Sequence, residues 1–179
     1  MRNITEILTN YTRLVEKVDT LCDEITRGFA GHITCKKGCD GCCLHFSIFW
    51  VEAVNLAMAV KGLPGEEAAL LRSRVRLRAD QEVCPLLREG GCLLYEHRPI
   101  ICRTHGLPIL TGQSGSAVID FCPRNFQHAE SIPGNAVIHL DRLNETLAVI
   151  NTLFVQQYFQ GTPPPLERVS IADSLFLKF

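Results

Sequence analysis

The sequence lacks a long apolar run and lacks a strong excess of charge of either sign. Its net charge is −1 at pH 7, so no basic field favours nucleic acid as a partner. The longest apolar stretch, Ala53 to Val60, is interrupted by Asn55 and is too short to span a bilayer. The first residues, Met1 to Glu6, lack the apolar run of a secretion signal. We therefore expect a cytoplasmic protein with no membrane and no nucleic-acid partner.

The sequence also lacks the common motifs of catalysis by side chains. It has no paired-carboxylate motif, no Gly-x-Ser-x-Gly elbow, no phosphate-binding glycine loop and no internal repeat. A cysteine–histidine nucleophile, for example Cys102 with His105, stays open, although metal ligation explains Cys102 better. The sequence therefore does not decide whether the protein is an enzyme.

What the sequence does have is nine cysteines in 179 residues. A chain of this length can bury a core without disulfides, and cytoplasmic thiols stay reduced, so metal ligation is favoured over a disulfide framework. Cys22 lies on the apolar stripe of a predicted helix, so we interpret it as a core residue. The other eight fall in segments predicted to be loops or element ends, where the backbone can turn thiolates inward. These eight predicted ligands are Cys35, Cys39, Cys42, Cys43, Cys84, Cys92, Cys102 and Cys122.

The spacing of the eight cysteines leaves the number of sites open. Four thiolates satisfy a tetrahedral zinc ion or one iron–sulfur cluster, so eight can fill two sites. Alternatively, one site is structural and the remaining thiols support it or take part in redox chemistry. The adjacent Cys42 and Cys43 are awkward ligands for one small ion, because neighbouring side chains diverge; they serve different sites, or one is a supporting residue.

The cysteine spacing favours iron–sulfur over zinc. A cytosolic zinc module usually has paired cysteines two residues apart in both halves, and here only Cys39 and Cys42 show that spacing. The expected cofactor is an iron–sulfur cluster, in first place 4Fe-4S, with zinc as the alternative. Cys35, Cys39 and Cys42 also have the spacing of radical S-adenosylmethionine enzymes. However, no strand–helix alternation follows them. A full barrel also takes about 250 residues, more than the 179 of the whole sequence, so we do not favour this class of enzyme.

The hydrophobic pattern predicts a single domain, residues 1–179, that is mostly α within an α+β class. About four main helices surround a cysteine-rich loop region with a small β-hairpin. Ser47 is the predicted cap of the second helix, and Glu52 is expected on its polar side. The predicted helices cover residues 3–29, 48–60, 66–82 and 139–160; the hairpin strands cover 107–110 and 117–121; a short helical tail starts near 170. The metal-binding core is 35–123, and 139–179 is the C-terminal helical part.

The N-terminal segment, residues 1–30, is predicted to be an amphipathic helix. Its apolar residues repeat with a period of about 3.5, with Tyr11, Val18 and Ile25 among them. Such a stripe must pack on the rest of the domain or on a second copy of the chain, so a homodimer is one of two open alternatives.

The pattern as a whole resembles the YkgJ-type cysteine-cluster proteins, which are described as a zinc- or iron-chelating domain. The resemblance rests on CKKGCDGCC, then CPLL, Gly91-Cys92, Tyr95, Arg98-Pro99, Cys102-Arg103, His105-Gly106 and finally FCP. It covers roughly residues 35 to 123 and includes all eight loop cysteines. The resemblance implies metal or iron–sulfur binding, but it implies no particular reaction.

Four further residues are candidates to support the bound group. Arg98 and Arg103 flank Cys102, where fixed cations would lower thiol pKa values and offset cluster charge; the alternative is ordinary hydrogen bonding to loop carbonyls. Tyr95 is expected to pack across the loop. His105 is expected to support the ligands rather than ligate, whereas His45 is expected to be structural.

Three functional hypotheses follow. The first is an iron–sulfur protein with a redox or electron-transfer role and a redox partner protein. The second is a zinc-stabilised interaction module without chemistry of its own. The third is a metal chaperone or sensor, which binds metal exchangeably and passes it on.

Overall fold

The computed structural model describes residues 3–36, 38–77, 82–113, 116–162 and 164–178. Its α-helices are α1 (Ile4–Ile7), α2 (Thr9–Gly28), α3 (Trp50–Lys61), α4 (Gly65–Arg76), α5 (Ile100–Thr104), α6 (Leu140–Tyr158) and α7 (Ile171–Ser174). Two 3-10 helices are η1 (Tyr95–His97) and η2 (Gly134–Ala136). The strands are β1 (Ser47–Phe49), β2 (Leu87–Arg88), β3 (Gly91–Cys92), β4 (Ile109–Gln113), β5 (Ser116–Asp120), β6 (Ile138–His139) and β7 (Arg168–Ser170). Four substantial helices and small sheets confirm the predicted mostly α, α+β class.

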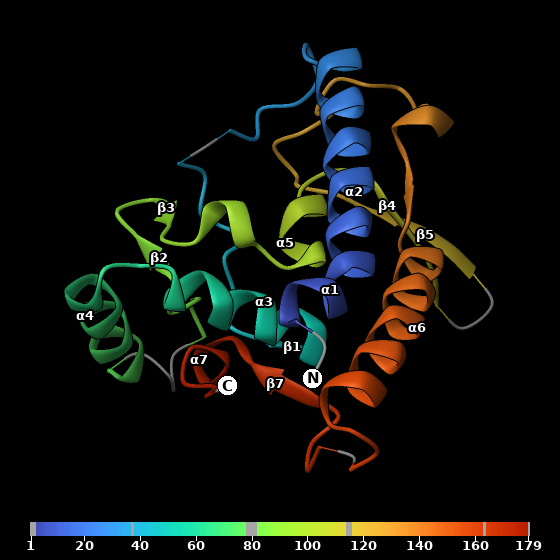
Figure 1. Cartoon of the computed structure of the whole chain (residues 1–179). Helices are drawn as coiled ribbons and strands as arrows, with labels where there is room; N and C mark the ends of the chain where they lie inside the picture. The colour runs from blue at the N-terminus through green and yellow to red at the C-terminus, as the bar shows by residue number, and fades with distance from the viewer. Residues whose placement is uncertain (1–2, 37, 78–81, 114–115, 163, 179) are drawn as a thin grey trace.

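The predicted N-terminal helix is present as α1 and α2, separated at Leu8. In Figure 1, α2 stands between α5 and α6, and it contacts both. The buried residues of α2 recur at helical spacing along one face. They are Tyr11, Leu14, Val18, Cys22 and Ile25. The stripe is therefore buried within the chain, so packing this face does not require a second copy.

The second predicted helix begins later than expected. Ser47 does not cap it, because Ser47 lies in β1 opposite Ser170 of β7, and α3 starts at Trp50. Glu52 is not on a polar face either. It is 3% exposed, and its Oε2 accepts a hydrogen bond from the backbone N–H of Phe49 at 3.1 Å. The two errors have different causes: Ser47 pairs with the distant strand β7, whereas the Glu52 carboxylate accepts backbone hydrogen bonds from Phe49 and Ile100 in the core.

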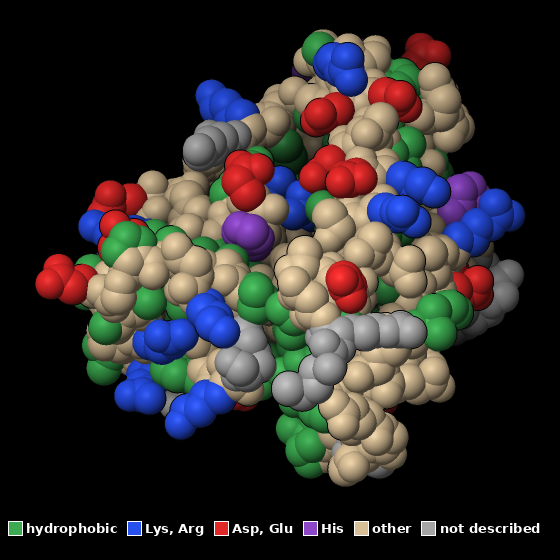
Figure 2. Space-filling view, in the orientation of Figure 1, with side chains coloured by type: hydrophobic (Ala, Val, Ile, Leu, Met, Phe, Trp, Pro, Cys, Tyr) green, Lys and Arg blue, Asp and Glu red, His purple; other side chains and the backbone are tan. Residues whose placement is uncertain are grey.

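Helix α4 ends at Arg76, earlier than the pattern predicts, and residues 78–81 lie outside the described part of the chain. Basic side chains gather at the lower left of Figure 2, where Figure 1 places α4. Two arginines of α4 contact the C-terminal tail. Arg72 Nε donates to the Leu175 carbonyl at 2.9 Å, and the Arg76 guanidinium lies over the Phe176 ring at 4.7 Å.

The predicted hairpin is present as β4 and β5, paired antiparallel from Ile109↔Asp120 to Gln113↔Ser116. The sequence did not indicate the third strand, β6, which pairs parallel with β4. The hairpin is fixed to α6 by the backbone N–H of Gly112, which donates to Asp141 Oδ2 at 2.7 Å. Strand β5 of this sheet ends at Asp120, two residues before Cys122.

The C-terminal part follows the prediction. Helix α6 covers the expected segment, and Ser170 caps α7 by accepting a hydrogen bond from the Asp173 N–H at 2.9 Å. Leu175 is fully buried, as expected of a residue that closes the core. Within the described ranges, every helix is too short or too polar to cross a membrane.

Candidate metal centre

A cavity of about 480 Å³ lies where the first cysteine loop meets the β2–β3 hairpin, α5 and α2. All nine cysteines are free thiols. Seven of the eight predicted ligands line this cavity, together with Cys22. The seven are Cys35, Cys39, Cys42, Cys43, Cys84, Cys92 and Cys102. The tertiary structure therefore gathers thiols that lie far apart in the sequence.

The eighth predicted ligand, Cys122, lies beside Cys35. The two are linked through Gly106, whose backbone φ is +90°. A Cβ placed on Gly106 would lie 2.9 Å from Cys35 Sγ and 3.6 Å from Cys122 Cβ. Only glycine adopts this conformation easily and leaves this space, so Gly106 lets the two cysteines approach from opposite ends of the cluster region.

The first loop presents its cysteines through two successive turns. The N–H of Cys39 donates to the Lys36 carbonyl, and the N–H of Cys43 donates to the Asp40 carbonyl, both at 2.9 Å. Each turn thus ends at a cysteine. The loop passes close to the β2–β3 turn, because a Cβ on Gly90 would lie only 3.2 Å from the Gly38 carbonyl oxygen.

The second group of cysteines is joined to the first loop by backbone pairing. The N–H of Cys84 donates to the Cys43 carbonyl at 2.9 Å, next to an antiparallel bridge between Leu44 and Val83. The β2–β3 hairpin then brings Cys92 back opposite Leu87. Cys43, Cys84 and Cys92 are therefore neighbours through main-chain geometry.

Cys102 corrects the prediction that all eight cysteines lie in loops or at element ends. It lies inside the short helix α5, which the sequence pattern did not reveal. The first turn of α5 is anchored by the buried Glu52, whose Oε1 accepts from the Ile100 N–H at 2.9 Å. Burial raises the pKa of the Glu52 carboxyl, and hydrogen bonds from Ile100 and Phe49 oppose that rise.

Asn125 is a site residue that sequence reasoning missed. It is 1% exposed, and its Nδ2 donates to Cys35 Sγ at 3.3 Å and to the Gly106 carbonyl at 2.6 Å. Its Oδ1 accepts from the Thr34 N–H at 2.8 Å. The signal available in the sequence was a polar residue three positions after Cys122. In the structure, the N–H of Asn125 donates to the Cys122 carbonyl.

Comparison with known proteins adds one finding to this geometry. Residues 34–123, half of the chain, match the family described as CxxCxxCC, "Putative zinc- or iron-chelating domain". The chain belongs to this CxxCxxCC family. No curated protein and no solved structure matches the chain. This match confirms the resemblance to a cysteine-cluster family seen in the sequence. It indicates a metal-binding protein, and its description is compatible with either zinc or iron.

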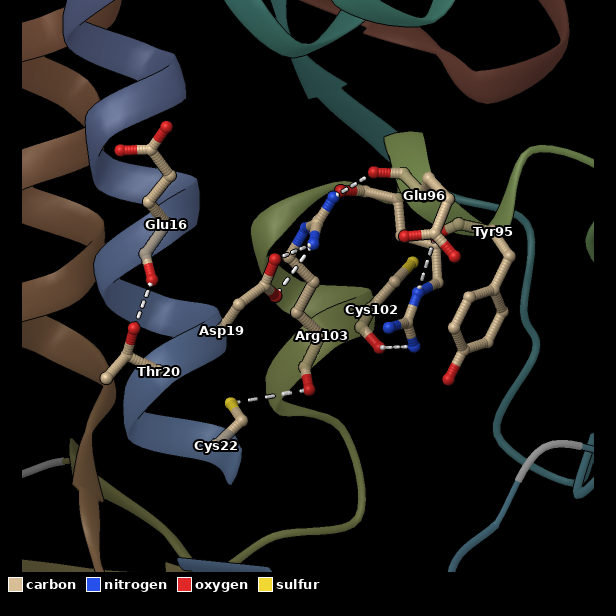
Figure 3. A network of polar contacts seen from close by, with 9 residues as sticks. Glu16, Asp19, Thr20, Cys22, Tyr95, Glu96, Cys102 and Arg103 are labelled. Atoms are coloured by element: carbon tan, nitrogen blue, oxygen red, sulfur yellow. Dashed lines mark hydrogen bonds and ion pairs between the residues drawn. The ribbon is translucent and has the colours of Figure 1, made fainter. Parts of the chain in front are cut away.

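In this CxxCxxCC protein, the Arg103 side chain bonds to other parts of the chain. Its guanidinium donates to the Arg98 and Glu96 carbonyls and forms an ion pair with Asp19 of α2, with Nη1–Oδ1 at 2.7 Å (Figure 3). The Arg103 side chain is 4% exposed and that of Asp19 is 44% exposed. Arg103 therefore ties α2 and η1 to α5, as the hydrogen-bonding interpretation predicted. The thiol of Cys22 donates to the Arg103 carbonyl at 3.6 Å, which fits its core role.

Arg98 is a cation close to the thiols that line the cavity. Its Nε donates to the Tyr95 carbonyl at 2.9 Å, and its guanidinium lies 3.7 Å from the centre of the Tyr95 ring. Nη1 reaches the Cys102 carbonyl at 3.4 Å. Arg98 and Tyr95 therefore form one packed unit at the cavity wall. Arg98 remains a candidate for offsetting thiolate charge.

The two histidines near the cluster differ in role. His105 lines the cavity but is exposed, so it lies at the rim. His45 Nε2 accepts from the Ala172 N–H at 3.3 Å, which ties the first loop to α7. His45 is therefore structural, as expected.

Burial raises the pKa of most of these thiols. For Cys84 it reaches about 11, and the charges of Cys92 and Cys43 add to the rise. For Cys102, burial raises the pKa further, the Cys84 and Cys92 charges reinforce the rise, and Arg98 opposes it. The Cys84 and Cys102 thiols are thus protonated at neutral pH before metal enters, so ligation by them releases protons.

The donor set suits a thiophilic metal. Soft thiolates select zinc, copper(I) and iron–sulfur clusters over hard cations. Within the described ranges, no three His, Cys, Asp or Glu side chains are yet arranged to hold an ion. The thiols of these described residues thus line the cavity without meeting at one point. Asn125 and Arg98 are the groups positioned to support bound thiolates.

Proposed function

We propose that this protein binds iron as an iron–sulfur cluster and serves in electron transfer or another redox step. The observation that carries the proposal is the cavity of about 480 Å³, in whose wall thiols are the most numerous metal-ligating groups. Fe–S clusters are held by cysteine thiolates, and their potentials respond to hydrogen bonds and charge near the sulfurs. Asn125 bonded to Cys35 Sγ, and Arg98 near Cys102, supply both features.

The size of the cavity also favours a cluster. A single zinc ion needs four ligands about 2.3 Å from one point, whereas the thiols here are distributed around a larger volume. In the proposed role the cluster accepts one electron from a donor protein and passes it to an acceptor protein, and no covalent bond forms or breaks. We expect the partner to be a redox protein, and nine free thiols fit a reducing, cytoplasmic compartment.

The test is an anaerobic preparation with a visible absorption spectrum and measurement of iron, acid-labile sulfide and zinc per chain. The proposal expects a brown protein with equal iron and sulfide. The Cys22→Ala variant is the control, because Cys22 lines the cavity but donates to a carbonyl in the core. A colourless protein that holds zinc and no iron would overturn the redox function.

A zinc-stabilised interaction module is the second candidate. The backbone hydrogen bond between Cys43 and Cys84 favours this candidate. A metal ion bound by both residues would join two segments distant in sequence and so stabilise the folded state. Structural zinc sites are closed by four protein ligands and take part in no redox change. Removal of zinc by a chelator should then unfold the protein. Rapid exchange without unfolding would instead indicate a metal chaperone or sensor.

A further inference from the structure

Two segments at opposite ends of the family match are hydrogen-bonded to each other near the C-terminal end of α2 (Figure 1). They are residues 32–35, which follow α2, and residues 122–126, which follow β5. The N–H of Phe126 donates to the His32 carbonyl at 2.7 Å, and the rings of these two residues stack with their centroids 5.6 Å apart. We call this pair of segments the clasp.

The Asn125 side chain lies inside the clasp in a fixed orientation. Its Oδ1 accepts from the N–H of Thr34 at 2.8 Å. Its Nδ2 donates to the Gly106 carbonyl at 2.6 Å and to Cys35 Sγ at 3.3 Å. A backbone N–H can only donate and a carbonyl can only accept, so these partners determine which end of the amide faces the sulfur. Cys35 is therefore positioned by contacts within the polypeptide, without help from a metal.

Cys122 is positioned beside Cys35 by the same contacts. Its N–H donates to the Gly106 carbonyl at 3.2 Å, and its own carbonyl accepts from the Asn125 N–H at 2.8 Å. Cys35 Sγ and Cys122 Cβ both lie within 4 Å of the place where a Cβ on Gly106 would stand. The two cysteine side chains also share a hydrogen bond. These thiols are therefore neighbours in the metal-free protein.

Two neighbouring free thiols can form a disulfide when no metal holds them. Both Cys35 and Cys122 are partly exposed, so a small oxidant can reach them. Burial raises the pKa of Cys35, although the Asn125 hydrogen bond opposes the rise, and a small thiolate fraction makes oxidation slow. The clasp therefore decides which disulfide forms, rather than how fast it forms. Disulfides of cytosolic proteins are usually transient and take part in catalysis or redox sensing.

We propose that Cys35 and Cys122 form a reversible disulfide when the metal centre is empty, and that this disulfide excludes metal. The disulfide itself depends only on the clasp. Its effect on metal rests on the proposed function, in which both cysteines are metal ligands. Oxidation would thus convert the protein to a form that has lost two of its thiolate donors.

Hydrogen peroxide is the proposed oxidant, and the reaction has two steps. In the first, an S–O bond forms on Cys35 as the O–O bond breaks, which gives a sulfenic acid and one water. In the second, the Cys122 sulfur attacks the Cys35 sulfur. The S–S bond forms, the S–O bond breaks, and the oxygen leaves as water with the proton of Cys122. Two electrons pass from the two thiols to the peroxide, and a dithiol reductant returns them.

The test begins with full-length wild-type protein that has been freed of metal by a chelator under anaerobic conditions. One equivalent of hydrogen peroxide is added, the remaining thiols are blocked, and cross-linked peptides are mapped by mass spectrometry without reduction. The main cross-link should join Cys35 to Cys122, and dithiothreitol should remove it. A main cross-link between other cysteines, such as Cys39 and Cys42, or oxidation without a cross-link, would overturn the proposal.

Two variants test whether the clasp selects the pair. Asn125→Ala removes the contacts to Thr34, Gly106 and Cys35, so the yield of the cross-link should fall several-fold. Gln127→Ala is the matched control, because Gln127 is exposed and donates only to the Pro123 carbonyl; it should keep the wild-type yield. Equal yields in the two variants would overturn the role of the clasp. If circular dichroism shows that Asn125→Ala is unfolded, Thr34→Val, which removes only a hydroxyl, repeats the test.

Metal binding is tested with zinc, which takes part in no redox change of its own. Protein loaded with zinc should form the Cys35–Cys122 cross-link several-fold more slowly, and zinc should leave in step with the cross-link. Equal rates with and without bound zinc would overturn the exclusion of metal. Wild-type protein that binds neither zinc nor iron would defeat both the proposed function and the exclusion, whereas the disulfide is decided by the peptide map alone.

Discussion

Replacing Gly106 by alanine is the sharpest perturbation of the thiol cluster. Gly106 has φ +90°, and the new Cβ would lie 2.9 Å from Cys35 Sγ. A positive φ costs an alanine about 1–2 kcal/mol relative to glycine. Nonbonded heavy atoms prefer about 3.5–4.0 Å, so the sulfur must move by roughly 0.6 Å or more, while metal–ligand distances tolerate only about 0.2 Å. Gly106→Ala should therefore lose stability and, with Cys35 as a proposed ligand, also bind less metal.

Gly161→Ala is the matched control, because Gly161 has φ +87° and nothing described lies within 4 Å of the place where its Cβ would stand. It should lose about 1–2 kcal/mol of unfolding free energy and keep its metal. The assay is urea unfolding followed by circular dichroism, with elemental analysis of the folded protein. Gly106→Ala should keep less metal than Gly161→Ala and the wild type. Equal metal contents in the two variants would refute the reasoning that Gly106 makes room for Cys35.

Three further predictions concern the residues that hold the site in place. Arg103→Ala should lower the free energy of unfolding by about 2–3 kcal/mol, because it removes a buried partner of the half-exposed Asp19 and leaves two carbonyls unpaired; urea unfolding measures this, and a change under about 0.5 kcal/mol would contradict it. Glu52→Gln should cost about 1–3 kcal/mol and speed hydrogen exchange of the Ile100 amide, because an amide oxygen replaces only one of the two carboxylate oxygens that accept from Ile100 and Phe49; unchanged exchange would count against the anchor. In metal-free protein, burial raises the pKa of Cys22 from 9.0 to about 11, with Asp19 adding to the rise. Its contribution to stability should be complete below pH 9 and disappear as pH rises to about 11, a loss of about 2–3 kcal/mol that Cys22→Ala should abolish; identical pH curves for the two proteins would refute it.

The elements that the sequence predicted well are those whose pattern is local. Helices α2, α3 and α6 carry apolar residues at helical spacing, and the hairpin β4–β5 has a turn-forming sequence between two apolar runs. Ser170 at the start of α7 is a capping residue in the structure, close to where the sequence predicted the helical tail to begin. In each case the signal and the structure depend on residues within a few positions of one another.

The elements that were missed depend on distant partners. Ser47 has the side chain of a helix cap, but pairing with Ser170 makes it a strand residue. Helix α5 is too short for a periodic pattern to reveal, and its first turn depends on Glu52, 48 residues earlier in the chain. The third strand, β6, has only two residues and forms because β4 offers it a free edge.

The chemistry of the metal centre follows from the order of its residues alone. The eight cysteines outside α2 and their spacing are sufficient to predict a thiolate metal site and the family. Which thiols become neighbours depends instead on long-range structure. Cys35 meets Asn125 across 90 residues, and Cys43 meets Cys84 through a strand-like bridge. The physical reason is that ligand type is a property of each residue, whereas proximity is a property of the folded backbone, which long-range pairing and burial determine together.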